Sequence, residues 1–216
     1  EENYAATRDF GQKGTYIEAI SGIDIALWDI LGQSLGAPVH MLLGGAFRDR
    51  VAAYATGCYY RGDDVLDLRA MIPALVAEAR SYVDAGFTMV KTKVGLLSVE
   101  ADLERLAAIR EAIGPAIPMM VDANHAYNAY TAIRLGHGME PLNVLWFEEP
   151  VPPEDRAGYR RVREALSIPI AGGECEWTRY GFRDLLAEGC VDIAQPDLCA
   201  SGGFSEWSKI HGLASA

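Results

Sequence analysis

The hydrophobic positions near the start of the chain recur every three or four residues. The stripe between Thr15 and Leu35 consists of Ile17, Ile20, Ile23, Leu27, Leu31 and Leu35. This spacing predicts an amphipathic helix over that range. Gly36, Ala37 and Pro38 follow directly, and we expect them to end the helix.

After this helix the pattern becomes a repeated unit: a short apolar or β-branched run, a polar turn and a helical stretch. The predicted strands are Val51–Thr56, Phe87–Lys93, Ile117–Asp122, Val144–Glu148, Ile168–Gly172 and Val191–Gln195. The predicted helices lie near Leu66–Ala85, Val99–Ile113, Ala129–Met139, Arg156–Leu166, Tyr180–Ala187 and Phe204–Ala214. Strands that alternate with helices in this way indicate an α/β fold with a parallel sheet buried on both faces.

Polar residues interrupt the pattern where successive strands end. They are Lys91, Lys93, Asp122, Glu148, Glu174 and Asp197. A closed barrel gathers its chemistry at the carboxyl ends of many strands, whereas an open sheet uses one switch point. The pattern therefore favours a TIM-type (β/α) barrel over an open sheet.

Composition narrows the range of partners. The chain has 216 residues, half of them hydrophobic, and a formal net charge of −11. That charge would repel nucleic acid and anionic membrane surfaces. The chain has no apolar run near the roughly 20 residues that a bilayer requires, and its polar opening segment does not resemble a signal peptide. We therefore expect a soluble cytoplasmic protein without nucleic-acid or membrane partners.

The cysteines and tryptophans add no separate chemistry. Cys58, Cys175, Cys190 and Cys199 lack the CxxC spacing of a zinc site, so we expect buried thiols. Trp28, Trp146 and Trp207 are expected to pack against other side chains rather than to hold a ligand.

Four of the strand-end residues are carboxylates, and three of these could bind one metal ion together. Asp122, Glu148 and Glu174 should converge from three neighbouring strands, and they would repel one another unless a cation lay between them. Mg²⁺ fits best because it accepts a few carboxylates and leaves positions for water or substrate. Mn²⁺ is the alternative ion, and the lack of a His or Cys cluster argues against zinc.

Two lysines share a strand face with this predicted metal site, because residues two apart project to the same side. A carboxylate substrate on the metal would have its α-proton acidified. Lys93 is the candidate base, since the Lys91 ammonium and a dication should both lower its pKa. Lys91 would then stay protonated and stabilise the enolate.

The loops beyond two strands supply further candidates. Asn124 should share the face of Asp122, and His125 follows it, so both could contact substrate. Glu149 is expected to point away from Glu148.

Simpler structural roles compete with these assignments. Asp122, Glu148 and Glu174 could each cap a following helix, although three in register favour a shared function. Asp197 could simply start a helix, and His125 could be an exposed loop residue.

Six motifs together resemble the mandelate racemase subgroup of the mandelate racemase/muconate lactonizing enzyme family, in the enolase superfamily. They are AISGIDIALWDILGQSLGAPVHMLLGG, KTK at 91–93, VDAN at 121–124, WFEEP at 146–150, GGE at 172–174 and QPD at 195–197. The resemblance implies the modified (β/α)7β barrel, and a Lys or His base that acts with Mg²⁺ on an ene-diolate.

The resemblance also implies roles for individual residues. It makes Asp122, Glu148 and Glu174 metal ligands, Lys93 the base and Lys91 the group that meets the substrate carboxylate. Asp197 resembles the aspartate that orients a histidine on the seventh strand.

The same resemblance implies that the chain is incomplete. No residue after Asp197 fills the histidine role, because His211 lies in the helical stretch after strand six. We expect a lead-in segment at 1–14 and a partial barrel of about six βα units at 15–216. The N-terminal capping domain and the last barrel strands would be absent, roughly the first third and last quarter of a member whose barrel has about 250 residues.

Dehydration of an acid sugar is the reaction that the resemblance favours. The alternatives are a racemase or epimerase of an α-hydroxy acid, and a cycloisomerase, against which the QPD motif weighs mildly. A catalytically silent metal-binding protein is the alternative from another class. The expected partners are a small-molecule carboxylate substrate and further copies of the chain in a homo-oligomer.

Overall fold

The computed structural model describes residues 1–60 and 67–216, which form two compact units. The first unit contains Glu1–Val51, Gly173–Glu188 and Ala194–Ala216, and the second contains Ala52–Gly172 and Gly189–Ile193. Among the helices of these described residues, none has the length and apolar character needed to cross a membrane.

The second unit is built on a parallel sheet. Its strands are β1 (Ala55–Thr56), β2 (Val90–Lys93), β3 (Met119–Asp122), β4 (Val144–Glu148) and β5 (Ile170–Gly172), and β6 (Ile193–Ala194) begins in it. The strand order is β1-β2-β3-β4-β5-β6, and each pair from β1 to β5 is parallel. Order in the sheet follows order in the chain, as in a barrel, whereas a doubly wound sheet reverses at a switch point.

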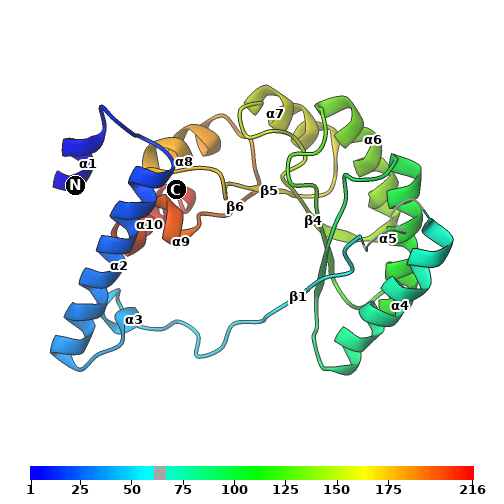
Figure 1. Cartoon of the computed structure of the whole chain (residues 1–216), viewed down its shortest axis with the longest axis horizontal. Helices are drawn as coiled ribbons and strands as arrows, with labels where there is room; N and C mark the ends of the chain where they lie inside the picture. The colour runs from blue at the N-terminus through cyan, green and yellow to red at the C-terminus, as the bar shows by residue number, and fades with distance from the viewer. Residues whose placement is uncertain (61–66) are drawn as a thin grey trace. The chain divides into compact units, whose positions relative to one another are not determined.

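Helices cover one side of this sheet (Figure 1). They are α4 (Leu68–Asp84), α5 (Val99–Ile113), α6 (Ala129–Met139) and α7 (Arg156–Ala165), and the 3₁₀ turn η2 (Glu140–Leu142) follows α6. Helix α5 packs between α4 and α6, and α6 packs against α7. Ser98, Asn128 and Asp155 cap the first turns of α5, α6 and α7 with their side-chain oxygens, which satisfies backbone N–H groups that have no helical partner.

The core of the second unit lies between the strands and these helices. Fully buried strand residues are Val90, Met119, Met120, Val121, Phe147 and Ile170, and fully buried helix residues include Leu106, Ile109, Leu135, Met139 and Val162. Consecutive residues of a strand are buried because both faces of the sheet are covered. Helices cover one face, and on the other face the side chains of neighbouring strands pack against one another. Charged side chains that emerge at the carboxyl ends of these strands therefore start from a rigid base.

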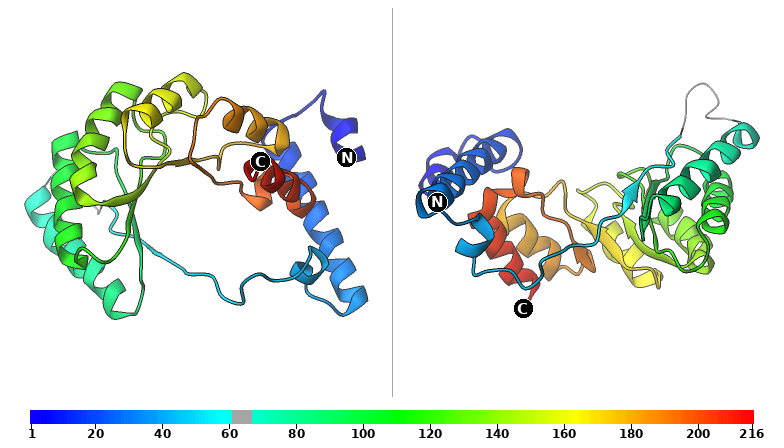
Figure 2. Two further views of the ribbon diagram at one scale, coloured as in Figure 1. Left: turned by 180° about the vertical axis from the view of Figure 1, so that it is seen from behind. Right: turned by 90° about the horizontal axis from the view of Figure 1, so that it is seen from below.

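The first unit is helical. It contains α1 (Glu2–Thr7), α2 (Thr15–Leu35), α3 (Val39–Leu42), α8 (Thr178–Ala187), α9 (Leu198–Ser201) and α10 (Gly203–Ala214). Helix α10 packs against α8 and α2, and Figure 2 shows α10 in red beside α2 in blue. Trp28 on α2 donates its indole N–H to Ser205 Oγ at 3.0 Å and contacts the Phe204 ring edge-on.

The predicted helices are all present, and α2, α5 and α6 have the predicted bounds. Leu66, where one helix was expected to start, lies outside the described residues. Strand β4 has the predicted bounds, whereas the other described strands start later than predicted: Val51 and Tyr54 are exposed, and β1 begins only at Ala55. Helices α1, α3 and α9 were not predicted, because segments of four to six residues carry no apolar stripe.

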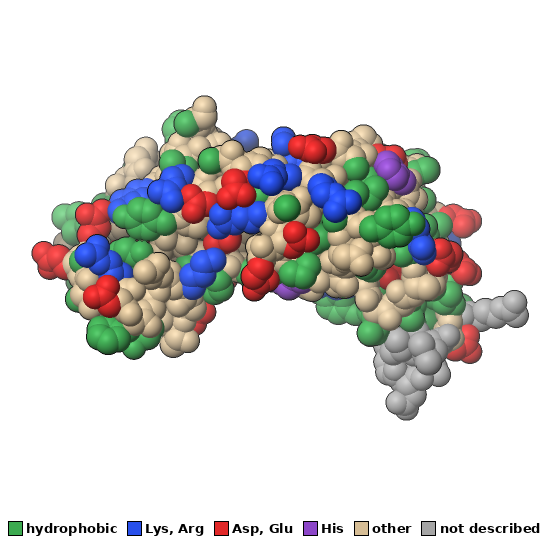
Figure 3. Space-filling model, turned by 90° about the horizontal axis from the view of Figure 1, so that it is seen from above, with side chains coloured by type: hydrophobic (Ala, Val, Ile, Leu, Met, Phe, Trp, Pro, Cys, Tyr) green, Lys and Arg blue, Asp and Glu red, His purple; other side chains and the backbone are tan. Residues whose placement is uncertain are grey.

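The structure confirms one further prediction only in part and leaves another untested. Cys58 and Cys190 are buried as expected, but the expectation of a buried thiol is wrong for Cys199, which is exposed in the first turn of α9. Acidic and basic side chains are interspersed over the face seen in Figure 3. The division into a lead-in segment at 1–14 and a barrel at 15–216 stays a prediction.

Candidate active site

Lys91 and Lys93 project together from the end of β2, as their spacing predicts. The Lys91 ammonium lies 2.5 Å from Glu148 Oε1 and 3.0 Å from Asp122 Oδ2. The Lys93 ammonium lies 2.6 Å from the same Asp122 oxygen and also donates to Asn124 Oδ1. Both lysines therefore meet at one carboxylate.

The two carboxylates face each other across neighbouring strands. Asp122 is paired with Glu148 in the β3–β4 register, and Lys93 is paired with Asp122 in the β2–β3 register. Asp122 and Glu148 are 0% and 2% exposed. Two buried negative charges this close would repel each other without positive partners, and the Lys91 ammonium, bonded to both, supplies one.

The second oxygens of the two carboxylates also accept hydrogen bonds. Asp122 Oδ1 accepts the Asn124 backbone N–H at 2.9 Å, and Glu148 Oε2 accepts the Trp146 indole N–H at 2.9 Å. Trp146 is two residues before Glu148 on β4, so both side chains project from the same strand face. These bonds fix the orientation of each carboxylate.

The charges in this cluster stabilise one another. Burial alone would lower the pKa of Lys91, but the hydrogen bond to Glu148 and the charges of Asp122 and Glu148 outweigh it and raise that pKa. Burial would raise the pKa of Asp122, but its hydrogen bonds from Lys93 and from the Asn124 backbone, together with the Lys91 charge, lower it. At neutral pH Lys91 is an ammonium and Asp122 a carboxylate.

The loops after β3 and β4 have an unusual backbone. Asn124, His125 and Glu149 have φ angles of 40°, 66° and 42°, a region that non-glycine residues seldom adopt and that costs about 1–3 kcal/mol each. The His125 N–H donates to the Glu149 carbonyl at 2.9 Å. Such strain persists only where the surroundings hold it, and it recurs at functional sites.

Glu149 belongs to this cluster, which the sequence reasoning missed. Its Oε2 lies 3.3 Å from His125 Nε2 and 3.4 Å from Asn124 Nδ2, and the residue is 1% exposed. Since Asn124 also binds the Lys93 ammonium, it links Lys93 to Glu149. Strand alternation alone predicted that Glu149 points away from Glu148. The signal in the sequence that could have indicated a role for Glu149 was the pair of adjacent acids before a proline.

The other predicted site residues belong to the first unit. Glu174 is exposed in the turn directly after β5. Asp197 is also exposed, and its side chain accepts the Cys199 N–H at 2.7 Å as the N-cap of α9. His211 lies in α10, as predicted, and stacks on Trp207. The metal role of Glu174 and the catalytic role of Asp197 stay predictions.

The described donor set suits a hard cation. Oxygen atoms of Asp122 and Glu148 converge on a single positive nitrogen, that of Lys91, which marks a point where both carboxylates favour a cation. Carboxylate oxygens are ligands that Mg²⁺ and Mn²⁺ prefer. The indole of Trp146 orients one of these ligands, as outer-shell hydrogen bonds do around metal sites.

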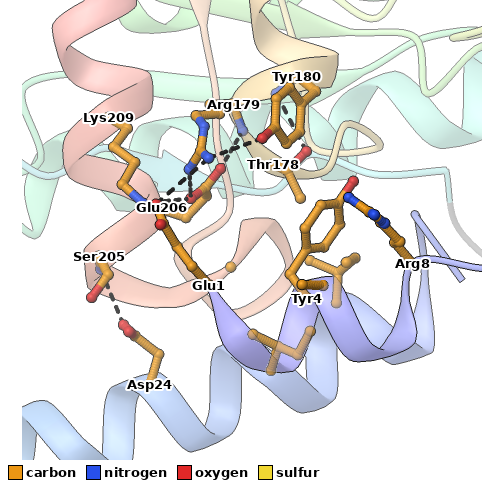
Figure 4. Close-up of a pocket in the computed structure, with 14 residues that line it drawn as sticks. Glu1, Tyr4, Arg8, Asp24, Thr178, Arg179, Tyr180, Ser205, Glu206 and Lys209 are labelled. Atoms are coloured by element: carbon orange, nitrogen blue, oxygen red, sulfur yellow. Dashed lines mark hydrogen bonds and ion pairs between the residues drawn. The ribbon is translucent and has the colours of Figure 1, made fainter.

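A separate cavity of about 230 Å³ lies in the first unit, between α1, α2, α8 and α10. Figure 4 shows Arg179 and Lys209 directed at Glu206 and Glu1. Arg179 Nη1 lies 2.8 Å from Glu206 Oε2, and Lys209 lies 2.9 Å from Glu1 Oε1. Four of its charged groups, Glu1, Arg179, Glu206 and Lys209, are thus paired with one another, and the predicted site residues do not line it.

Comparison with known families matches both parts of the chain. Residues 74–216 match the model described as enolase C-terminal domain-like. Residues 3–44 match the model described as mandelate racemase / muconate lactonizing enzyme, N-terminal domain.

Two curated relatives are similar over nearly the whole chain. The D-galactarolactone cycloisomerase of Agrobacterium fabrum is 50% identical over 212 residues, which cover 98% of this chain and 54% of that protein. The arabinonate dehydratase of Saccharolobus solfataricus is 41% identical over 214 residues, which cover 99% of this chain and 56% of that protein. The chain therefore spans about half the length of these relatives.

Solved structures show the same fold. The 3,6-anhydro-D-galactonate cycloisomerase from Zobellia galactanivorans superposes with a TM-score of 0.91 at 48% identity, over 99% of this chain and 57% of that one. The L-talarate dehydratase from Polaromonas, solved with Mg and L-glucarate, superposes with a TM-score of 0.89 at 32% identity, over 99% of this chain and 58% of that one.

Proposed function

Because this chain belongs to the mandelate racemase/muconate lactonizing enzyme family of the enolase superfamily, we propose that its protein removes the α-proton of an acid-sugar carboxylate. Lys93 is the base and Mg²⁺ the cofactor, with Mn²⁺ as the alternative. The observation that carries the proposal is the contact of the Lys93 amine with Asp122, the residue paired in register with Glu148.

Asp122 and Glu148 would hold the cation, and Glu174 is proposed as the third ligand. When bound, the cation would withdraw electron density from the substrate carboxylate and so acidify the neighbouring C–H bond. Magnesium accompanies an acid-sugar ligand in the Polaromonas L-talarate dehydratase structure, which supports the same pairing here.

The lysines divide the remaining work. Lys93 takes the proton from the α-carbon onto its side-chain nitrogen. Lys91 stays charged because two carboxylates surround it, and it offsets the negative charge that builds on the substrate carboxylate. Asn124 holds Lys93 from the side, and His125 is proposed to contact substrate.

The fate of the enolate distinguishes three candidate reactions. In dehydration a hydroxyl on the β-carbon leaves as water. In cycloisomerisation a ring oxygen on the β-carbon leaves instead, so the ring opens and no atoms are lost. The cycloisomerases at 50% and 48% identity favour this second candidate more strongly than the QPD motif weighs against it. Racemisation, which needs a second base beside Asp197, is the third.

The proposal is tested by incubating the full-length protein and Mg²⁺ with a panel of aldonic acids, aldaric acids and their lactones and anhydro forms. We expect α-proton exchange with deuterated solvent by NMR, together with formation of a keto acid. A product lighter by one water identifies a dehydratase, and a product of unchanged mass from a cyclic substrate identifies a cycloisomerase. If no member of the panel exchanges its α-proton, the proposal is refuted. The catalytically silent metal-binding protein then becomes the favoured alternative.

Three further properties of the protein are proposed as well. The net charge of −11 supports a protein without nucleic-acid or membrane partners, and a cytoplasmic location is proposed with it. A homo-oligomeric state is proposed from the family resemblance. Light scattering on the full-length protein measures it.

A further inference from the structure

A fully buried ion pair lies behind the strand that carries the two lysines. Asp102 and Arg105, one helical turn apart on α5, are both 0% exposed, and Arg105 Nη1 lies 2.7 Å from Asp102 Oδ1. Charged side chains are almost never buried so completely unless they are paired. The desolvation of such a pair often exceeds its Coulombic gain, so stability alone is a weak reason for it.

Arg105 reaches the main chain of two neighbouring strand ends. Its Nη1 donates to the Lys93 carbonyl at 3.3 Å, and its Nη2 donates to the Cys58 carbonyl at 3.0 Å. The Cys58 carbonyl also accepts the Thr92 hydroxyl at 3.0 Å. The guanidinium therefore ties the segment after β1 to the end of β2, at the residue proposed as the base.

Asp102 holds the turn that follows. Its Oδ2 accepts the Gly95 N–H at 2.9 Å. Gly95 has a φ of +114°, and a Cβ there would lie 2.4 Å from Ala126 Cβ, so the chain needs glycine to turn this sharply. The main chain is thus fixed at Lys93 by Arg105 and two residues later by Asp102.

Two tyrosines complete the surroundings of Asp102. The Tyr60 hydroxyl donates to Oδ1 at 2.6 Å, and the Tyr127 hydroxyl donates to Oδ2 at 3.3 Å. Burial and the neighbouring Asp102 raise the pKa of both phenols, so both remain neutral donors. The Arg105 guanidinium also stacks on the Tyr60 ring, 4.0 Å from its centroid.

We propose that Asp102 and Arg105 are positioning residues that hold the end of β2 at Lys93 and at Gly95, so that the Lys93 amine keeps its place beside Asp122. This inference rests on the proposed function of Lys93. The pair touches neither substrate nor the reacting atoms, so its loss should lower kcat without weakening substrate binding. A displacement of about 1 Å at a reacting group can cost about 10²-fold in rate.

Helix α5 offers a matched control. Arg110 also donates to main-chain carbonyls, to Leu142 at 2.8 Å and to Ile117 at 2.6 Å. These carbonyls precede β4 and β3, whereas Arg105 binds at the carboxyl end of β2. Removing Arg110 should therefore reduce stability without moving Lys93.

The test measures kcat, KM and melting temperature for the full-length enzyme with Mg²⁺ and its acid-sugar substrate, at a temperature where every variant is folded. We expect Arg105→Met and Asp102→Asn to lower kcat for α-proton exchange by about 10- to 100-fold with little change in KM. Arg105→Lys, which can reach only one carbonyl at a time, should recover part of the loss. Arg110→Met should lower the melting temperature and leave kcat unchanged.

Wild-type kcat in Arg105→Met, or an equal loss of kcat in Arg110→Met, would overturn the inference. If Arg105→Met does not fold, Tyr60→Phe and Arg105→Lys replace it, and unchanged kcat in both has the same meaning. If the wild-type enzyme exchanges no α-proton, the proposed function itself fails. Amide hydrogen exchange at Gly95 then decides: faster exchange in Asp102→Asn supports the anchoring, and unchanged exchange contradicts it.

Discussion

Replacing Lys91 with Met removes the positive charge that Asp122 and Glu148 share, while keeping an unbranched side chain. Lys91 is 8% exposed and bonds both carboxylates. Removing one partner of a buried ion pair costs about 3–5 kcal/mol, because the remaining charge stays buried without compensation. We therefore expect Lys91→Met to lower the free energy of unfolding by at least about 3 kcal/mol in a metal chelator.

Magnesium should reverse much of this loss if the two carboxylates form a cation site. A ligand at 100 times its Kd stabilises the folded state by about 2.7 kcal/mol. In the wild-type protein the Lys91 ammonium already binds the same oxygens, so Mg²⁺ should stabilise the variant more than the wild type. Chemical denaturation of the full-length protein, with chelator and with Mg²⁺, measures all four free energies.

Arg134→Met is the matched control. Arg134 Nη2 lies 2.7 Å from Glu100 Oε1 and the two side chains are 51% and 73% exposed, and exposed ion pairs contribute only about 0–1 kcal/mol. The control variant should lose little free energy of unfolding, and this small loss should not change with Mg²⁺. A Lys91→Met loss below about 1 kcal/mol, or the same Mg²⁺ stabilisation in Lys91→Met and wild type, would refute the reasoning.

Three further outcomes are expected. Exhaustive chelation should abolish α-proton exchange by the intact protein, and full activity afterwards would exclude the mechanism. Trp146→Phe, which removes the hydrogen bond to Glu148, should weaken Mg²⁺ affinity by about 10- to 100-fold in a titration; unchanged affinity would contradict this. Hydrogen bonds from Ser167 lower the pKa of Glu140 from 4.5 to about 2, so its stabilisation is complete above pH 4.5 and lost as the pH falls through 2. Glu140→Gln should thus melt lower than wild type at pH 6 but not at pH 2, whereas Glu164→Gln, on the exposed face of α7, should match wild type at both.

Much of the fold followed from periodicity. Helices such as α5, with an apolar stripe over 15 residues, had the predicted bounds. The starts of strands were less predictable, because an apolar residue such as Val51 does not show whether a neighbouring strand pairs with it. Strand pairing depends on the whole sheet, and the sequence of one run carries little of that information.

The centre of the site was predictable for a similar reason. Alternation along β2 placed Lys91 and Lys93 on one face, and the parallel register brought Asp122 and Glu148 together. Glu149 was missed because its positive φ angle breaks the alternation rule. The hydrogen bond of Trp146 was missed because a tryptophan is usually explained by packing alone.

The buried pair behind β2 could not be found from the sequence. Asp102 and Arg105 look like ordinary charged positions of a surface helix, where pairs three residues apart are common. Only the structure shows that both are fully buried and that their hydrogen bonds end on the main chain beside Lys93. Their importance depends on tertiary contacts that no local pattern reports.

The role of Lys93 is tested most directly by solvent exchange at the substrate α-carbon. The full-length wild-type protein and Lys93→Ala are incubated in D₂O with Mg²⁺ and an acid sugar that the wild type accepts, and deuterium incorporation is followed by NMR. We expect exchange by the wild type and none by Lys93→Ala for substrates of one α-carbon configuration, while Lys209→Ala behaves as wild type. Undiminished exchange by Lys93→Ala would show that this amine is not the base.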